Sequence, residues 1–111
     1  MAIGFLMRDS LYVLQLAGER DSLGAEKAVF RRGARVQCGW GRLSERSDES
    51  PLGRENRGLN IAVIHPLVEE PLWVEHGGKV YRVRETRRFA GFSSDHWELV
   101  LEEYTGRFEI R

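Results

Sequence analysis

The chain has 111 residues, of which 41% are hydrophobic and 31% are charged, so it can form one domain with a real core and does not have the composition of a disordered segment. Its 17 Lys and Arg residues balance 17 Asp and Glu residues, which excludes a net field that would draw the protein onto nucleic acid or an anionic membrane. The single cysteine, Cys38, excludes an internal disulfide and a zinc motif, and so favours an intracellular protein that holds no metal.

The first predicted element is a strand over residues 11–17. It follows a lead-in, residues 2–9, that is short and ends in charges, and therefore fits neither a signal peptide nor a membrane span. Polar and apolar residues alternate in the strand, which places Tyr12, Leu14 and Leu16 on one face.

A second strand is predicted over residues 33–40, after an exposed loop at residues 18–30 that is rich in glycine and charge. Val36, Cys38 and Trp40 share one face of this strand. A cysteine in such an alternation is most often a small core hydrophobe, so we expect no nucleophile here. Glycine on both sides of the tryptophan predicts a bend or bulge.

A long polar segment, Ser44–Gly58, follows the second strand and contains one large apolar side chain, Leu52. It cannot bury itself, and a structureless loop of this length is usually functional or disordered. The next strand is predicted over residues 59–64, covered on both sides, with Ile61 and Val63 on one face.

The clearest pattern is a hairpin over residues 72–83 that turns at Gly77 and Gly78, because a glycine pair tolerates the positive φ of a two-residue turn. Folding about this turn places Trp73 opposite Arg82, near enough for the guanidinium to stack on the indole. The opposite face of the hairpin is apolar and consists of Leu72, Val74, Tyr81 and Val83.

A last strand is predicted over residues 96–104, after a polar connection at residues 86–95. We expect its apolar face and that of the hairpin to share one core with earlier strands. Besides the hairpin residues, this core would contain residues from the last, second and third strands, namely Trp97, Leu99, Leu101, Val36, Trp40, Ile61 and Val63. About six strands without an amphipathic helix favour an all-β fold. We predict a single domain, residues 1–111, folded as a small antiparallel β-barrel with a long loop between strands two and three.

Chemistry-bearing residues are sparse in this pattern. The predicted strands do not bring together the three histidines, His65, His76 and His96, and neighbouring acids fall on opposite faces of a strand. Phosphate-binding glycine loops and nucleophile elbows are missing from the sequence. We therefore expect no catalytic residue, no metal site and no cofactor, and a protein that is not an enzyme.

One alternative concerns single-stranded nucleic acid. Arginines interleaved with aromatic residues on a small barrel can bind phosphates and stack bases. The residues in this pattern are Arg82, Arg84, Arg87, Arg88, Phe89, Phe92 and Trp97. Glutamates at positions 85, 98, 102 and 103 dilute the positive charge, so this reading stays the second choice.

The order of elements resembles the head-tail joining proteins of tailed bacteriophages, in the head-closure or stopper group. The resemblance covers residues 11–104. It rests on a first strand followed by a turn, a second strand, a long polar loop and a final pair of strands. After the first strand these pieces are, in order, Asp21–Gly24, Ala34–Val36, Ser44–Gly58, Gly78–Val83 and Trp97–Leu101.

This resemblance implies a ring of identical barrel subunits below the portal and its adaptor, at the head-tail interface of a virion assembled in the host cytoplasm. The ring would retain packaged double-stranded DNA in its channel and bind a tail-completion protein, without a membrane. The loop would gate the channel through Ser44, Glu45, Arg46, Ser47, Asp48, Glu49, Ser50, Arg54, Glu55 and Arg57. The outer hairpin face suggests subunit contacts through Trp73, Glu75, Arg82 and Arg84.

Overall fold

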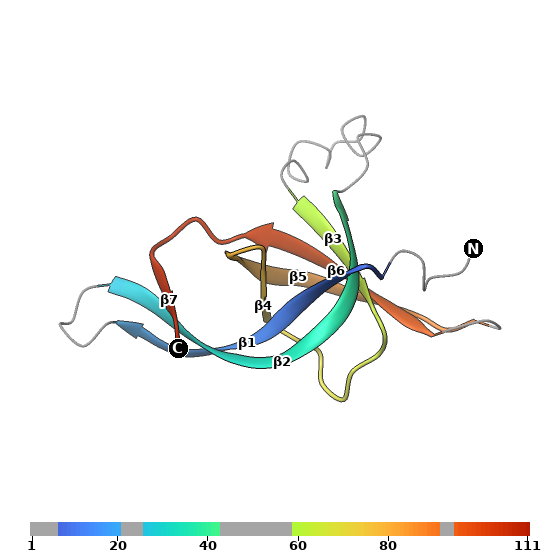
Figure 1. Cartoon of the computed structure of the whole chain (residues 1–111), viewed down its shortest axis with the longest axis horizontal. Helices are drawn as coiled ribbons and strands as arrows, with labels where there is room; N and C mark the ends of the chain where they lie inside the picture. The colour runs from blue at the N-terminus through green and yellow to red at the C-terminus, as the bar shows by residue number, and fades with distance from the viewer. Residues whose placement is uncertain (1–6, 21–25, 43–58, 92–94) are drawn as a thin grey trace.

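The structure is a computed structural model that describes residues 7–20, 26–42, 59–91 and 95–111. Its strands are β1 (Asp9–Arg20), β2 (Glu26–Arg42), β3 (Leu59–Ile64), β4 (Trp73–His76), β5 (Lys79–Phe89), β6 (His96–Glu103) and β7 (Phe108–Ile110) (Figure 1). The sheet order is β1-β4-β5-β6-β3-β2-β7, and β1 also pairs with β2. Six antiparallel strands therefore close a barrel, as predicted, and β7 adds to β2 in parallel.

No helix in the described part of the chain is long and apolar enough to cross a membrane.

The hairpin prediction is confirmed in detail. Trp73 pairs with Arg82 and His76 pairs with Lys79, so the register is the one that the glycine turn dictates. Gly77 and Gly78 have φ values of 59° and 80°, the left-handed values that favour glycine. Local turn chemistry is thus sufficient to set this part of the barrel.

The first two strands are longer than their sequence pattern predicts. The expected loop at residues 18–30 is wrong, because β1 continues to Arg20 and β2 already begins at Glu26. Register shifts along β1 let the pair twist as an antiparallel ribbon that leaves the barrel, and its charged side chains stay on the solvated outside. The expected bulge at Trp40 is also wrong, because β2 pairs with β3 there without a shift.

The main core fills the barrel. Its buried members are Leu11, Cys38, Ala62, Ile64, Val74, Tyr81, Trp97, Leu99 and Leu101. Trp40, Val36 and Val83 pack against it, as predicted. The prediction is wrong for Leu72, which is 70% exposed, and for Ile61 and Val63, which lie on the other face of β3.

A second, smaller core lies between the β1–β2 ribbon and the outer face of the β4–β5 hairpin. Its buried members are Leu14, Phe30 and Val80. Trp73 packs against them, with its ring 4.9 Å from Phe30 and 5.7 Å from Tyr104. The ring contacts of this indole therefore go to the ribbon and to the segment before β7, in place of the predicted stack on Arg82.

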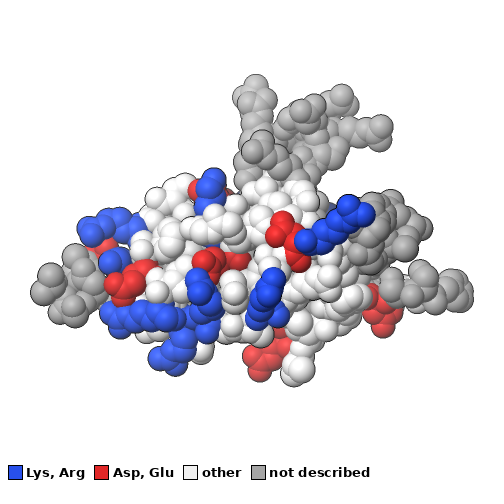
Figure 2. Space-filling view, in the orientation of Figure 1, with Lys and Arg blue, Asp and Glu red and all other residues white. Residues whose placement is uncertain are grey.

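The molecule is elongated, with principal extents of 51 × 33 × 20 Å. The β1–β2 ribbon and β7 lie toward one end of the long axis, and the end of β5 and the start of β6 lie toward the other (Figure 1). Lys and Arg side chains gather, together with acidic ones, on the β1–β2 end of the visible face (Figure 2).

Candidate functional site

The candidate site lies along the edge of β1 that faces away from β2. Strand β4 is four residues long and pairs with β1 only at Tyr12, Val13 and Leu14. Beyond Leu14 no described strand pairs with that edge, although β1 continues for six more residues, to Arg20. An edge of this kind leaves backbone N–H and C=O groups open to another strand.

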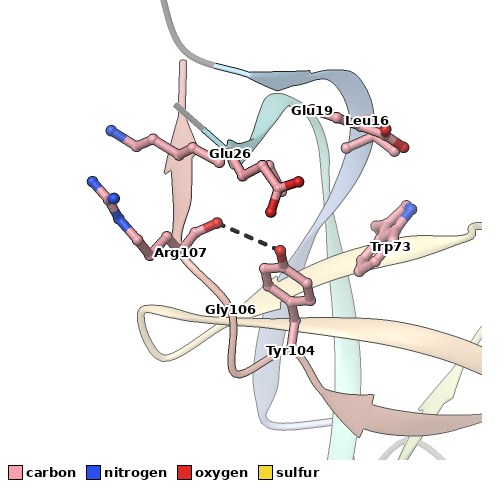
Figure 3. Close-up of a pocket in the computed structure, with 9 residues that line it drawn as sticks. Leu16, Glu19, Glu26, Trp73, Tyr104, Gly106 and Arg107 are labelled. Atoms are coloured by element: carbon pink, nitrogen blue, oxygen red, sulfur yellow. Dashed lines mark hydrogen bonds between the residues drawn. The ribbon is translucent and has the colours of Figure 1, made fainter. Parts of the chain in front are cut away.

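Two hollows flank this edge, with volumes of about 490 and about 630 Å³. Leu16 and Trp73 line both, so we treat the two as one surface and call it the β1 trough. Figure 3 shows the first hollow, with Trp73 and Tyr104 on the barrel side and Glu19 on the β1 side. Leu72 lines the second hollow and is mostly exposed, so this hollow has an apolar side chain open to solvent beside its charged lining.

Both signs of charge line the β1 trough. Glu19, Glu26 and Arg107 border the first hollow, and Arg31 and Glu69 border the second. None of these five side chains has an ion-pair partner among the described residues, although other lining residues do. The trough is therefore suited to a mixed-charge protein surface, and a polyanion would meet repulsion along part of it.

The predicted interface residues Trp73, Glu75, Arg82 and Arg84 occupy different surroundings. Trp73 lines the trough, whereas Glu75 is buried and accepts hydrogen bonds of 2.9 and 3.0 Å from Nε and Nη2 of Arg32. Arg82 is exposed, and Arg84 Nη1 lies 3.7 Å from Glu102 Oε2. The structure thus brings Trp73 and Glu75 against the ribbon and leaves the two arginines at the surface.

The predicted channel-gating residues, from Ser44 to Arg57, lie outside the described residues. The structure does fix the strands on both sides of them. Arg42 at the end of β2 pairs with Asn60 at the start of β3, so the segment begins and ends at neighbouring points of the barrel.

One of the three aromatic residues of the nucleic-acid alternative is not available for stacking on a base. Trp97 is 8% exposed in the barrel core, and Arg88 lies over its ring at 5.4 Å. Arg88 also pairs with Glu70 at 2.8 Å, and Arg87 pairs with Glu85 at 3.3 Å. Phe92 lies outside the described residues.

A polar cluster that the sequence did not indicate joins the start of β1 to the hairpin turn. His76 Nε2 lies 2.7 Å from Asp9 Oδ2, and the imidazole stacks on Trp40 with 3.7 Å between ring centroids. These residues are far apart in sequence, so no local motif could reveal them. Within the described ranges, no group of three or more His, Cys, Asp or Glu side chains could hold a metal ion.

The contact between Asp9 and His76 predicts that the stability of the folded protein falls in acid. The hydrogen bond from His76, together with the backbone N–H of Ser10, holds the pKa of Asp9 below its usual range. A lowered pKa in the folded state contributes stability above the unfolded pKa, and this contribution is lost as the pH falls through the folded one. We expect Asp9→Asn to be less stable than wild type at neutral pH, and the difference to shrink between about pH 5 and about pH 3. Urea unfolding across this range measures it, and a difference independent of pH would contradict it.

The chain matches no protein-family model and no curated protein. Among solved structures, its fold is similar to the solution structure of protein SF1141 from Shigella flexneri 2a, with a TM-score of 0.65 and 14% sequence identity. The match covers 91% of this chain and 96% of the Shigella protein. At this identity the likeness shows a shared fold, and the barrel is therefore an architecture that a second sequence also adopts.

Proposed function

We propose that this chain is a structural protein of a phage head-tail connector. In this proposal, identical subunits form a ring below the portal and its adaptor, in a virion assembled in the host cytoplasm. The ring retains packaged double-stranded DNA and docks the tail through a tail-completion protein. The observation that carries the proposal is a closed barrel in which Arg42 at the end of β2 pairs with Asn60 of β3, so that the strands before and after the polar segment 43–58 lie side by side.

The barrel suits a ring subunit for a mechanical reason. Closure pairs most strand edges within the subunit, so its shape does not depend on its neighbours. The described surface also carries interspersed charges, several of them in exposed ion pairs such as Lys79 with Glu103 and Arg84 with Glu102. Such pairs contribute little to folding and can exchange partners when subunits meet.

The segment Ser44–Gly58 is the proposed gate. Around a ring, identical segments would converge on the axis, where their acidic residues repel DNA phosphates. Their arginines, Arg46, Arg54 and Arg57, would pair with acids of the next copy. Each exposed pair stabilises the closed state by at most about 1 kcal/mol, so a docking tail can open it.

Replacing Ser44–Gly58 with a short Asn-Gly turn tests this function. We expect the variant to fold, because β2 and β3 are already paired at Arg42 and Asn60, and to join the connector. Its particles should lose packaged DNA, measured as the DNA content of purified particles against wild type. A scrambled segment with the same composition is the control for length and charge. Full, stable particles from the shortened variant would show that the gate lies elsewhere.

A further inference from the structure

We propose that the β1 trough binds an extended segment of a partner protein, which adds to the open edge of β1 as a strand and places a lysine or arginine side chain in the first hollow. The apolar neighbours of that basic residue enter the second hollow. This inference concerns the surface of one barrel and does not depend on the proposed ring.

The backbone of β1 offers the first argument. β4 pairs with this edge at Tyr12, Val13 and Leu14, and farther along β1 none of the described strands pairs with it. The N–H and C=O groups on that side are therefore available to a strand that continues the line of β4. Strand addition to an exposed edge gives affinity through main-chain hydrogen bonds, and the pockets beside the edge select the side chains.

The two hollows open on opposite faces of this edge. Leu16 pairs with Phe30, so both lie on the face of the second core, where the first hollow opens. Gln15 pairs with Arg31 on the other face, and both of these residues line the second hollow. Successive side chains of an added strand point to opposite faces, so they enter the two hollows alternately.

The first hollow favours a cation. Its aromatic side chains, Trp73 and Tyr104, can pack along the methylene stem of a lysine or arginine and attract its charge. Glu19 and Glu26 also line this hollow, and they make no ion pair with any side chain that the structure describes. In Figure 3 the carboxylate of Glu26 points toward the hydroxyl of Tyr104, whereas the guanidinium of Arg107 points away from both.

The basic residues beside the first hollow do not neutralise these carboxylates. Lys27 pairs with Glu109 at 3.4 Å. It is the carbonyl oxygen of Arg107 that meets Tyr104, accepting a hydrogen bond of 3.5 Å from the hydroxyl. An incoming ammonium or guanidinium group can therefore donate charge-assisted hydrogen bonds to Glu26, which is exposed at the start of β2.

The second hollow favours an apolar side chain, because Leu72 lines it and is 70% exposed. The side chains of Arg32 and Glu70, which also line it, are already held in ion pairs of 2.8 Å. The other two charged residues of its lining, Arg31 and Glu69, have opposite signs. Covering Leu72 with an aliphatic side chain of the partner removes apolar surface from water. The segment that fits the trough therefore has the order apolar, basic, apolar.

An NMR titration of the isotope-labelled protein with the capped peptide Thr-Val-Arg-Val-Thr tests this contact. The peptide has the same residue order in both directions, so the test does not depend on whether the strand adds parallel or antiparallel to β1. We expect the amide resonances of residues 15–19 to shift and to saturate, with a dissociation constant of about 1 mM or below. Saturable shifts that leave these residues unchanged, or no saturable shift at all, would overturn the proposal.

The charge contact is tested from both sides. Glu26→Gln in the protein and arginine to norleucine in the peptide are each expected to raise the dissociation constant roughly tenfold, because each removes one partner of a charge-assisted hydrogen bond. The matched control is Glu85→Gln, which removes an exposed carboxylate from β5 outside both hollows and should leave binding unchanged. Equal binding by wild type and Glu26→Gln would contradict a cation in the first hollow.

The strand contact is tested with the same peptide methylated at every backbone nitrogen, which keeps the side chains and loses the main-chain donors. We expect no saturable shift with this peptide, and affinity equal to that of the parent would rule out strand addition. Spectra recorded without peptide at several protein concentrations identify the other occupant of the edge. Shifts of residues 15–19 that grow with protein concentration would show that a second copy occupies the edge, and would overturn the partner segment.

Discussion

Replacing Phe30 with alanine is expected to lower the free energy of unfolding by about 3 to 5 kcal/mol, one of the two largest effects of a single change in this chain. Phe30 is fully buried, and its ring lies 4.9 Å from Trp73 and 6.2 Å from Tyr104. Among the described residues, Leu14 and Val80 are buried with it in the second core, and Trp73 and Tyr104 pack against this cluster, so the truncation removes the side chain at its centre.

Urea unfolding of this variant should be compared with that of Phe89→Ala, which removes the same atoms from a side chain that is 43% exposed. The control change should cost less, about 1 to 2 kcal/mol, because the Phe89 ring is partly exposed and stacks on His96 at the surface. Similar losses at both positions would show that the second core does not hold the ribbon against the barrel. A large loss at Phe30 alone also links stability to the trough, because Trp73 contacts this ring and lines both hollows.

Elements fixed by neighbouring residues could be predicted from the sequence, whereas elements fixed by contacts between distant residues could not. The β4–β5 hairpin was predicted to the residue because Gly77 and Gly78 fix both the turn and the register. The distal parts of β1 and β2 were missed because their charges resemble those of a loop. They are strands because each pairs with the other and because Phe30 covers the β4–β5 hairpin, which are contacts between distant residues.

The trough was beyond sequence reasoning for the same reason. Its open edge exists because β4 stops after four residues while β1 continues. How far one strand extends beyond its neighbour depends on the pairing of the assembled sheet. One signal was available for its border: Phe108 and Ile110 alternate with Glu109 after Gly106, the pattern of a short strand. That strand is β7, which pairs with β2 at residues 28–30 and closes one side of the second core.

The faces of β3 illustrate a different limit, because both faces of this strand are apolar and alternation alone cannot say which one enters the barrel. Pairing decides the question, since Ala62 lies opposite Leu99 and Ile64 lies opposite Trp97, and directly opposed residues share a face. Leu99→Ala is therefore expected to cost about 2 to 5 kcal/mol, because this side chain is fully buried in the main core.

Ile61→Ala is the matched change on the other face of β3, where the side chain is only half-buried, and it should cost about 1 kcal/mol. Both variants are measured by urea unfolding, with the slope of the transition checked against wild type so that a change in compactness is not counted as stability. A larger loss at Ile61 than at Leu99 would mean that β3 turns its Ile61 and Val63 face into the barrel. A shift of one residue in the β3–β6 register would exchange the faces of β3 in this way, while Trp97 and Leu99 of β6 would stay in the core.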